Sequence, residues 1–279
     1  MVDLAPGANP TVGVMEVVPA TCPGIDRIVR WEGFYNARDL GGLPTVTGAS
    51  TRYGRLIRSA DTRFITAAGW KAAHDAGIRV VIDLRNADEV EPGSLPAATL
   101  GAGTFAMPAA QATAARPADI QTTLIPVDDI EDLGLWRHLN AEGLNGTPLY
   151  YRPFLHAKPE RIAAVLTAIA RVPDGGVIFH CGAGRDRTGL ISLLLLSLAG
   201  VTPEAIAADY ELTFGQLARL YTALGLEQDE QDAREYLKSR GTTVSETITS
   251  LVRDLDVAEY LAAAGVSGAD IDALRGRLL

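Results

Sequence analysis

A short apolar run, a glycine-rich segment and a second apolar run follow one another between residues 177 and 198. The first run is Val177-Ile178-Phe179, and the second extends from Leu190 to Leu198. Between them the chain reads His-Cys-Gly-Ala-Gly-Arg-Asp-Arg-Thr-Gly over 180–189. This order predicts a strand, a tight loop and a helix. Because a helix N-terminus presents backbone N–H groups and the positive end of its dipole, we expect an anion site there.

The side chains of this segment suit phosphoryl transfer. The field at the helix start favours the thiolate of Cys181, which is the nucleophilic form of cysteine. Arg187 falls in the first helical turn, where its planar guanidinium can hold two phosphate oxygens. Thr188 can donate a hydrogen bond to the sulfur and ease its departure from phosphorus. The small residues that let the backbone close around an anion are Gly182, Ala183 and Gly184.

A lone cysteine at such a turn is more often a buried structural residue than a nucleophile. Here the cysteine is followed within seven residues by three small residues, an arginine and a threonine, which is the spacing that a phosphate-binding loop needs. A strand is expected before them and a helix after them. The combination favours a catalytic loop over a structural cysteine.

The pattern His-Cys, five residues, Arg-Thr resembles the signature of the cysteine-dependent protein tyrosine phosphatase superfamily. Its fuller form is similar to the bacterial tyrosine/lipid phosphatase branch, although Arg185 stands where that branch usually has lysine. The resemblance extends from about residue 28 to the end and is poorest over 92–121. Further segments that carry it are 36–42 (Asn-Ala-Arg-Asp-Leu-Gly-Gly), 55–59, 83–85 with Glu89, and 259–278.

Apolar runs and turn residues predict alternating strands and helices, followed by helices alone. We expect strands over 28–31, 56–58, 79–84, 122–127 and 176–180, and helices over 66–76, 159–171, 187–199 and from 203 onward. This is the pattern of an α/β fold with a parallel-rich central sheet flanked by helices, here phosphatase-like with a helical C-terminal part over 203–279. Residues 1–27 are predicted to be an N-terminal extension and 28–279 a single phosphatase domain. A ligand would bind at the carboxyl ends of the strands.

Residues 86–121 differ in character, because prolines and glycines alternate there with many alanines. The composition predicts a long loop, with some helix near 109–115. Such a loop is either a lid over the site or a segment without order, and both readings stay open.

Cleavage of a phosphate ester also needs a general acid for the leaving oxygen. In the resembled branch an aspartate after a strand and a proline supplies this proton. Counting from Pro126 places Asp129 at that position, with Asp128 as the alternative one residue earlier. A carboxyl group near others is pushed toward its protonated form, as a general acid requires. A solvated acidic run is the competing reading, since Glu131 and Asp132 follow.

The remaining candidates surround the loop. Arg185 could contact an anionic group or a second phosphate of the substrate with its bidentate fork, and the resemblance implies a substrate role for Asp186. Alternatively, the two residues pair with neighbours at the helix start. We expect these residues to support the loop rather than to react: His180, Asn36, Arg38, Asp39, Arg58, Asp83 and Arg85.

Charge and cysteine content limit the partners. The net charge of −9 argues against a nucleic-acid partner, although a local basic site can still bind an anion. The longest apolar run, 190–201, is too short for stable membrane insertion. Two cysteines make no disulfide framework, the histidines lack metal-ligand spacing, and no signal peptide is evident at the start. We therefore expect a cytoplasmic enzyme without metal or cofactor.

Together these features predict a metal-independent phosphomonoesterase that forms a phospho-cysteine. The resemblance implies phosphotyrosine as substrate, with phosphoserine, phosphothreonine or phosphoinositides as further ones. A small phosphorylated metabolite is the alternative substrate. A rhodanese-like sulfurtransferase also uses a cysteine loop at a helix N-terminus, but Thr188 and the Asp128-Asp129 pair argue against it. The presence of both Cys181 and Arg187 argues against a non-catalytic phosphate-binding module.

Overall fold

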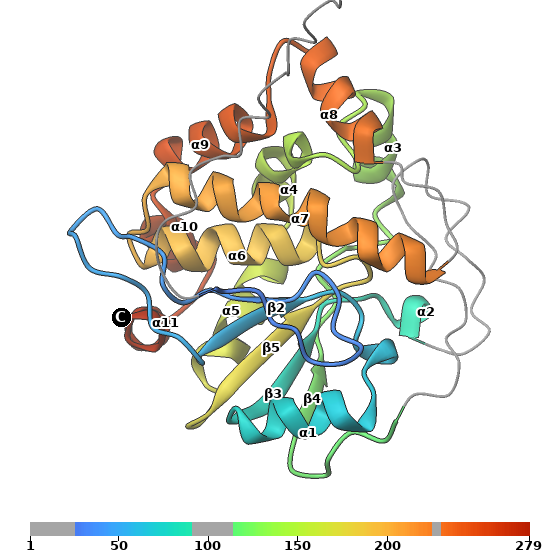
Figure 1. Ribbon diagram of the computed structural model, residues 1–279. Coiled ribbons are helices and arrows are strands. Elements are labelled where there is room, and N and C mark those ends of the chain that lie inside the picture. The colour runs from blue at the N-terminus through green and yellow to red at the C-terminus, as the bar shows by residue number, and fades with distance from the viewer. Residues whose placement is uncertain (1–25, 91–113, 225–229) are drawn as a thin grey trace, which may run out of the picture.

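The computed structural model describes residues 26–90, 114–224 and 230–279 (Figure 1). In these parts of the chain five strands form one sheet in the order β1-β2-β5-β3-β4. β1 runs antiparallel to β2, and the other neighbouring pairs are parallel. The predicted α/β class with a parallel-rich sheet is confirmed. The strands are β1 (Arg38–Asp39), β2 (Leu56–Ser59), β3 (Ile78–Asp83), β4 (Gln121–Leu124) and β5 (Gly176–His180).

Helices separate the later strands and follow the last one, and the part after residue 203 is helical as predicted. Those within the α/β part are α1 (Ala67–Asp75), α2 (Ala87–Val90), α3 (Leu133–Ala141), α4 (Tyr151–Ala157), α5 (Pro159–Ala170) and α6 (Asp186–Leu198). The C-terminal ones are α7 (Pro203–Leu224), α8 (Glu230–Ser239), α9 (Val244–Asp254), α10 (Val257–Ala263) and α11 (Gly268–Leu278). Single 3-10 turns lie at Thr62–Phe64 and Pro148–Tyr150.

Side chains alternate between the two faces of the sheet, and each face buries its own cluster. Ile57, Val81 and Ile178 pack with Trp70 of α1 on one face. On the other face, side chains such as Phe179 and Ile82 join the larger cluster of the remaining helices. The sheet is therefore covered on both sides, which is what a parallel sheet requires.

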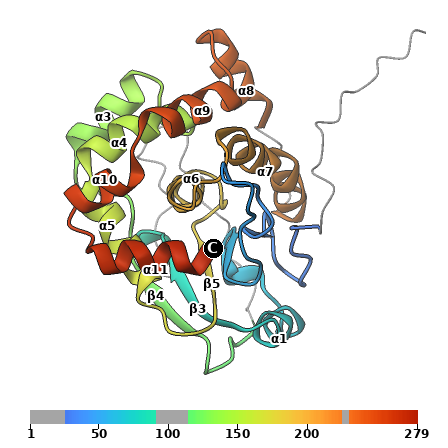
Figure 2. The same ribbon diagram turned by 90° about the vertical axis from the view of Figure 1, so that its left-hand side faces the viewer.

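α6 lies at the centre of the larger layer. Figure 2 looks nearly along this helix and shows α5, α7, α9, α10 and α11 around it. Eleven of its thirteen residues are buried, which explains why its sequence is apolar on every side. At Gly189 an added Cβ would lie 2.5 Å from the hydroxyl of Tyr151 and 2.8 Å from the ring of Tyr210. The glycine thus lets α4 and α7 approach the first turn of α6 closely.

Local signals set several helix ends. Thr66 caps α1 by accepting a hydrogen bond from the N–H of Gly69, and Gly77 follows that helix with φ +86°. Ser267 accepts from the N–H of Asp270 and donates to its carboxylate at 2.7 Å, so that the capping box at α11 is formed.

Other expectations need correction. Residues 28–31 form no strand, because Gly33 turns the chain back (φ +81°) and only the bridge from Ile28 to Arg38 remains. The strand expected over 122–127 already ends at Leu124, two residues before Pro126, which has no N–H for the ladder. α3 and α4 were not predicted.

The predicted loop over 86–121 is not wholly a loop, because its first residues form α2. Residues 91–113, which include most of the helix expected near 109–115, lie outside the described residues. Whether this segment acts as a lid stays a prediction. Most of the predicted N-terminal extension, Cys22 among it, is also outside them.

Candidate active site

Cys181 follows β5 directly, in the middle of the sheet. Its β-strand neighbour His180 lies in register with Ser59 of β2 and Asp83 of β3, so the three strand ends meet beneath the loop. Cys181 is only 3% exposed, and the loop of residues 181–185 leads into α6. The predicted strand, loop and helix are therefore present, with the cysteine at the carboxyl edge of the sheet.

The glycine at position 184 is required by the tight path of this loop. Its φ is +70°, which side chains other than glycine rarely adopt. A Cβ there would lie 2.5 Å from the carbonyl oxygen of Ser59. The loop thus packs directly on the end of β2.

Three residues from the chain before β3 hold the carbonyl groups of the loop. The Nδ2 atom of Asn36 donates to the carbonyl oxygens of Ala183 and Gly184, both at 3.0 Å. Arg58 donates to the same Gly184 carbonyl at 2.9 Å. The backbone N–H of Asp61 donates to the carbonyl oxygen of Gly182, also at 2.9 Å. Asn36 and Arg58 are two of the residues that the sequence predicts to support the loop.

Arg38 acts on the loop indirectly. Its guanidinium donates to Oδ1 of Asn36 at 2.7 Å and also binds Asp209 of α7. Asp209, which the sequence analysis missed, further accepts hydrogen bonds from Arg27 and Arg58. Neither a motif nor its spacing marks this aspartate, because its partners are far away in sequence.

Arg187 lies in the first turn of α6, as expected, and faces two carboxylates. Both of its terminal nitrogens pair with Glu89 of α2, one of them at 2.8 Å. Its Nε lies 3.3 Å from Oδ2 of Asp128. The N–H of Asn86 donates to Glu89 at 2.8 Å and holds that carboxylate in place. Glu89 was part of the family resemblance but was not predicted as a site residue.

The structure brings Asp128, not Asp129, to the arginine of the loop. Asp128 is 8% exposed, and its burial outweighs the attraction of Arg187, so the pKa of this carboxyl rises to about 6. Asp129 instead accepts a hydrogen bond from Lys158 at 2.9 Å and lies 3.4 Å from Arg161. The hydrogen bond from Lys158 is the main reason why the pKa of Asp129 is lowered. Adjacent side chains thus diverge, and the preference for Asp129 over Asp128 is not supported by this geometry.

Asp83, Arg85 and His180 form a buried group beneath the loop. Arg85 donates to Asp83 at 2.6 Å and to Asp61 at 2.6 Å, and Nδ1 of His180 lies 3.1 Å from the Cys181 carbonyl. Burial opposes ionisation of Asp83, but the nearby His180 and Arg85 lower its pKa to about 2. This ion-paired group lies where β3 and β5 end side by side, and its role in supporting the loop stays a prediction.

Asp39 does not reach the loop. Its carboxylate accepts hydrogen bonds from the N–H groups of Gly41 at 2.8 Å and Gly54 at 2.7 Å. The expectation that it supports the catalytic loop therefore needs correction, because both acceptor atoms are used in tying two turns together.

Arg185 and Asp186 pair with each other. Nε of Arg185 donates to both carboxylate oxygens of Asp186, at 3.1 and 3.2 Å, and the arginine side chain is only 13% exposed. This is the contact that the reading of a pairing at the helix start expects, and the substrate role of the two residues stays a prediction. The hydroxyl of Thr188 is buried and has no hydrogen-bond partner in the described part of the chain.

The described residues hold no group of three or more His, Cys, Asp or Glu side chains arranged to bind a metal ion. None of their helices is both long and apolar enough to cross a membrane.

The chain is similar in sequence to a known family and to several known proteins. The profile described as the tyrosine phosphatase family matches residues 29–279. A Cupriavidus necator protein named as a tyrosine-protein phosphatase is 30% identical over 63% of this chain and 59% of its own length. A tyrosine-protein phosphatase of Nostoc commune is 31% identical over 57% of this chain. The triple specificity protein phosphatase PtpB of Mycobacterium tuberculosis is 26% identical over 88% of this chain and 97% of its own length. The chain thus spans about half the length of the first two relatives (59% and 48%).

Proposed function

Because the chain belongs to the tyrosine phosphatase family, we propose that it hydrolyses phosphate monoesters through a phospho-cysteine intermediate. The observation that carries the proposal is the convergence of three groups at one edge of the sheet. Cys181 lies at the end of β5, Arg187 in the first turn of α6, and Asp128 3.3 Å from that arginine. They supply a nucleophile, a phosphate clamp and a proton donor.

In the first step the thiolate of Cys181 attacks phosphorus, and the bond from phosphorus to the ester oxygen breaks. Backbone N–H groups of the loop and the guanidinium of Arg187 bind the non-bridging oxygens as charge shifts among them. Asp128 transfers its proton to the departing oxygen. Its pKa of about 6 keeps a protonated fraction available near neutral pH, which a carboxyl with an ordinary pKa would not.

In the second step water attacks the phospho-cysteine. The carboxylate of Asp128 takes a proton from this water, and the bond between sulfur and phosphorus breaks to release inorganic phosphate. Thr188 donates a hydrogen bond from its hydroxyl group to the leaving thiolate and keeps its proton, a role for which its unpartnered Oγ1 is available. The cycle ends with Asp128 protonated and Cys181 as thiolate, so protons and charges balance.

Glu89 holds the guanidinium of Arg187 in the orientation that binds phosphate. The two-pronged contact fixes the plane of the guanidinium, and the backbone N–H of Asn86 fixes Glu89 in turn. A planar fork held in one orientation loses less freedom on binding a phosphate. The arginine and the loop amides together neutralise the charge that would otherwise call for a metal ion.

We propose phosphotyrosine as the main substrate, because the relatives carry that activity in their names. Another relative is named as a triple specificity protein phosphatase, which favours a broader range. We therefore extend the proposal to the further substrates that the family resemblance implies, phosphoserine, phosphothreonine and phosphoinositides. A small phosphorylated metabolite is the alternative. Since a reactive thiolate is preserved under reducing conditions, the cytoplasm is the proposed compartment.

The proposal is tested with aryl phosphates and a substrate panel. Cys181→Ser should abolish hydrolysis of nitrophenyl phosphate, and vanadate but not EDTA should inhibit the unmodified protein. Comparison of phosphopeptides, phosphoinositides and sugar phosphates then identifies the substrate class. Retained turnover in Cys181→Ser, or inhibition by EDTA alone, would contradict the mechanism.

A further inference from the structure

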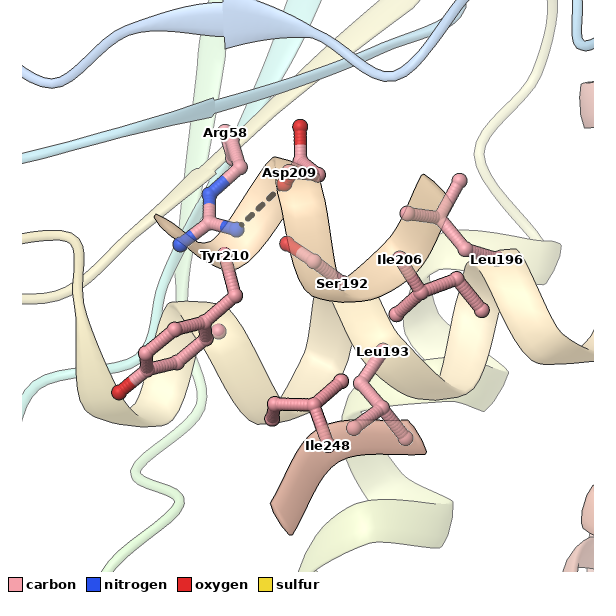
Figure 3. A pocket seen from close by; sticks show the side chains of 9 residues that line it. Arg58, Ser192, Leu193, Leu196, Ile206, Asp209, Tyr210 and Ile248 are labelled. Atoms are coloured by element: carbon pink, nitrogen blue, oxygen red, sulfur yellow. Dashed lines mark hydrogen bonds and ion pairs between the residues drawn. The ribbon is translucent and has the colours of Figure 1, made fainter. Parts of the chain in front are cut away.

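We propose that Asp209 of α7 is a positioning residue for the catalytic loop, acting through Arg38, Arg58 and Asn36. The inference rests on the proposed function, because it assigns a second helix to the phosphate site. Figure 3 shows Asp209 paired with Arg58 at one end of a small pocket between α6, α7 and α9. The rest of this pocket is mainly apolar, with Leu193, Leu196, Ile206 and Ile248 in its lining.

Asp209 is the shared acceptor of three arginines. Its Oδ1 accepts from Arg27 at 2.8 Å and from Nε of Arg38 at 3.0 Å, and its Oδ2 accepts from Arg58 at 2.8 Å. The side chains of Arg38, Arg58 and Asp209 are at most 1% exposed. One carboxylate thus compensates three cations in a place from which water is largely excluded. Burial and the neighbouring Arg58 lower the pKa of Arg38 to about 9.

Two of these arginines pass the restraint to the loop by separate routes. Arg58 uses its other terminal nitrogen to hold the Gly184 carbonyl at 2.9 Å. Arg38 donates to Oδ1 of Asn36 at 2.7 Å, and since an arginine can only donate, this contact turns Nδ2 of Asn36 toward the loop. Nδ2 then holds the carbonyls of Ala183 and Gly184.

Holding these carbonyls orients the amides that bind phosphate. In a planar trans peptide the C=O of one residue and the N–H of the next point in opposite directions. The carbonyls of Ala183 and Gly184 point toward Asn36 and Arg58. The N–H groups of Gly184 and Arg185 therefore point away from them, and their direction depends on the Asp209 network.

The packing of α7 on α6 also restrains the position of Asp209. Asp209 precedes Tyr210, whose ring lies against Gly189 in the first turn of α6. Thr213, one turn further along α7, accepts from Arg38 at 2.9 Å. The helix thus fixes Arg38 with two side chains and packs on the start of α6 with a third.

The test measures vanadate affinity and melting temperature together. Asp209→Asn keeps the shape of the side chain but removes its charge and one acceptor. We expect vanadate to bind at least tenfold more weakly, and kcat for nitrophenyl phosphate to fall by a similar factor. The matched control is Asp270→Asn, which removes a carboxylate that binds Arg171 at 3.0 Å and lies away from the loop. It should lower the melting temperature but leave vanadate affinity and kcat unchanged.

Two further variants test the route. Asn36→Gly tolerates the φ of +45° and removes the link from Arg38 to the loop without changing any charge. It should weaken vanadate binding, and combining it with Asp209→Asn should cost less than the product of the two single effects. If Asp209→Asn does not fold, Thr213→Val loosens Arg38 more mildly and should weaken vanadate binding about threefold.

Vanadate affinity within twofold of wild type in Asp209→Asn, or in Thr213→Val where that variant replaces it, overturns the proposal. The proposal is also overturned if the double variant, Asn36→Gly with Asp209→Asn, loses vanadate affinity by the full product of the two single losses. Vanadate binding, followed by calorimetry, needs no turnover. A wild-type protein that binds vanadate but cleaves no ester would contradict the proposed function and leave this test of positioning intact.

Discussion

Replacing Asp128 by asparagine should separate catalysis from stability. The burial that raises the pKa of this carboxyl destabilises its charged form, and Arg187 and a hydrogen bond from Asn86 offset only part of that cost. The pKa rises from the ordinary 3.8 to about 6 in the folded protein. Since each unit between the two pKa values corresponds to about 1.4 kcal/mol, the charged carboxylate costs about 3 kcal/mol above pH 6.

The sign of the pH dependence follows from the raised pKa. The stability that Asp128 contributes is fully present below its unfolded pKa of 3.8 and is lost as pH rises to about 6. Asparagine does not titrate. The free energy of unfolding of Asp128→Asn, relative to wild type, should therefore increase by about 2 kcal/mol between pH 4.5 and pH 7.5. Urea unfolding at the two pH values measures this difference.

The same substitution, Asp128→Asn, should lower the catalytic rate although it raises the stability at neutral pH. Loss of a general acid lowers kcat roughly 100- to 10,000-fold for an alkyl phosphate, and less for nitrophenyl phosphate, whose leaving group needs little help. The decline of kcat/KM above about pH 6 should also disappear in Asp128→Asn. A variant that is more stable at neutral pH but nearly inactive is the expected result.

Asp129→Asn is the matched control, because it changes the adjacent carboxyl group. The pKa of Asp129 is lowered, first by Lys158, so its contribution to stability is present above the unfolded pKa and lost as pH falls. Its removal should destabilise the protein at neutral pH by under about 1 kcal/mol and leave the rates unchanged. A rate loss in Asp129→Asn with none in Asp128→Asn, or no gain of relative stability for Asp128→Asn at neutral pH, would refute this reasoning.

Three further predictions concern the loop and its contacts. Gly184→Ala should cost about 1–3 kcal/mol of stability and most of the activity, because φ is +70° and the new Cβ would meet the Ser59 carbonyl; normal kinetics would exclude the tight loop path. Glu89→Gln should lower kcat/KM roughly tenfold by loosening Arg187, which steady-state kinetics would show, whereas unchanged kinetics would mean that the contact is idle. Gly189→Ala should lower the melting temperature through about 1–3 kcal/mol of overpacking against Tyr151 and Tyr210, and an unchanged melting temperature would argue against that close approach.

The parts of the site that sequence reasoning predicted are those specified locally. Val177 to Phe179, the loop glycines and the apolar run after them carry the signals of strand, turn and helix within a few residues. The position of Cys181 follows from that local order, because a parallel strand delivers its end to one edge of the sheet. Thr66 and Ser267 likewise cap their helices through neighbours three residues away.

The choice between Asp128 and Asp129 depends instead on partners distant in sequence. Counting from Pro126 cannot tell which of two adjacent carboxyl groups turns inward. Lys158 binds Asp129, and Arg187 with the buried surroundings holds Asp128. Asp209 is a stronger case, because α7 also carries Glu204 and Glu211 and no local signal distinguishes Asp209 from them. Its importance arises only where α7 meets arginines that precede it by more than 150 residues.

The buried surroundings of α6 have a consequence for how such enzymes diverge. With eleven of thirteen residues enclosed, nearly every substitution in this helix alters packing, so neutral variation has little room there. Two side chains close in sequence to site carboxylates are freer: Val90, which follows Glu89, is 40% exposed, and Leu133, five residues after Asp128, is 54% exposed. A lineage acquiring new substrates would thus change such exposed residues first, while the helix behind the nucleophile is inherited almost unaltered.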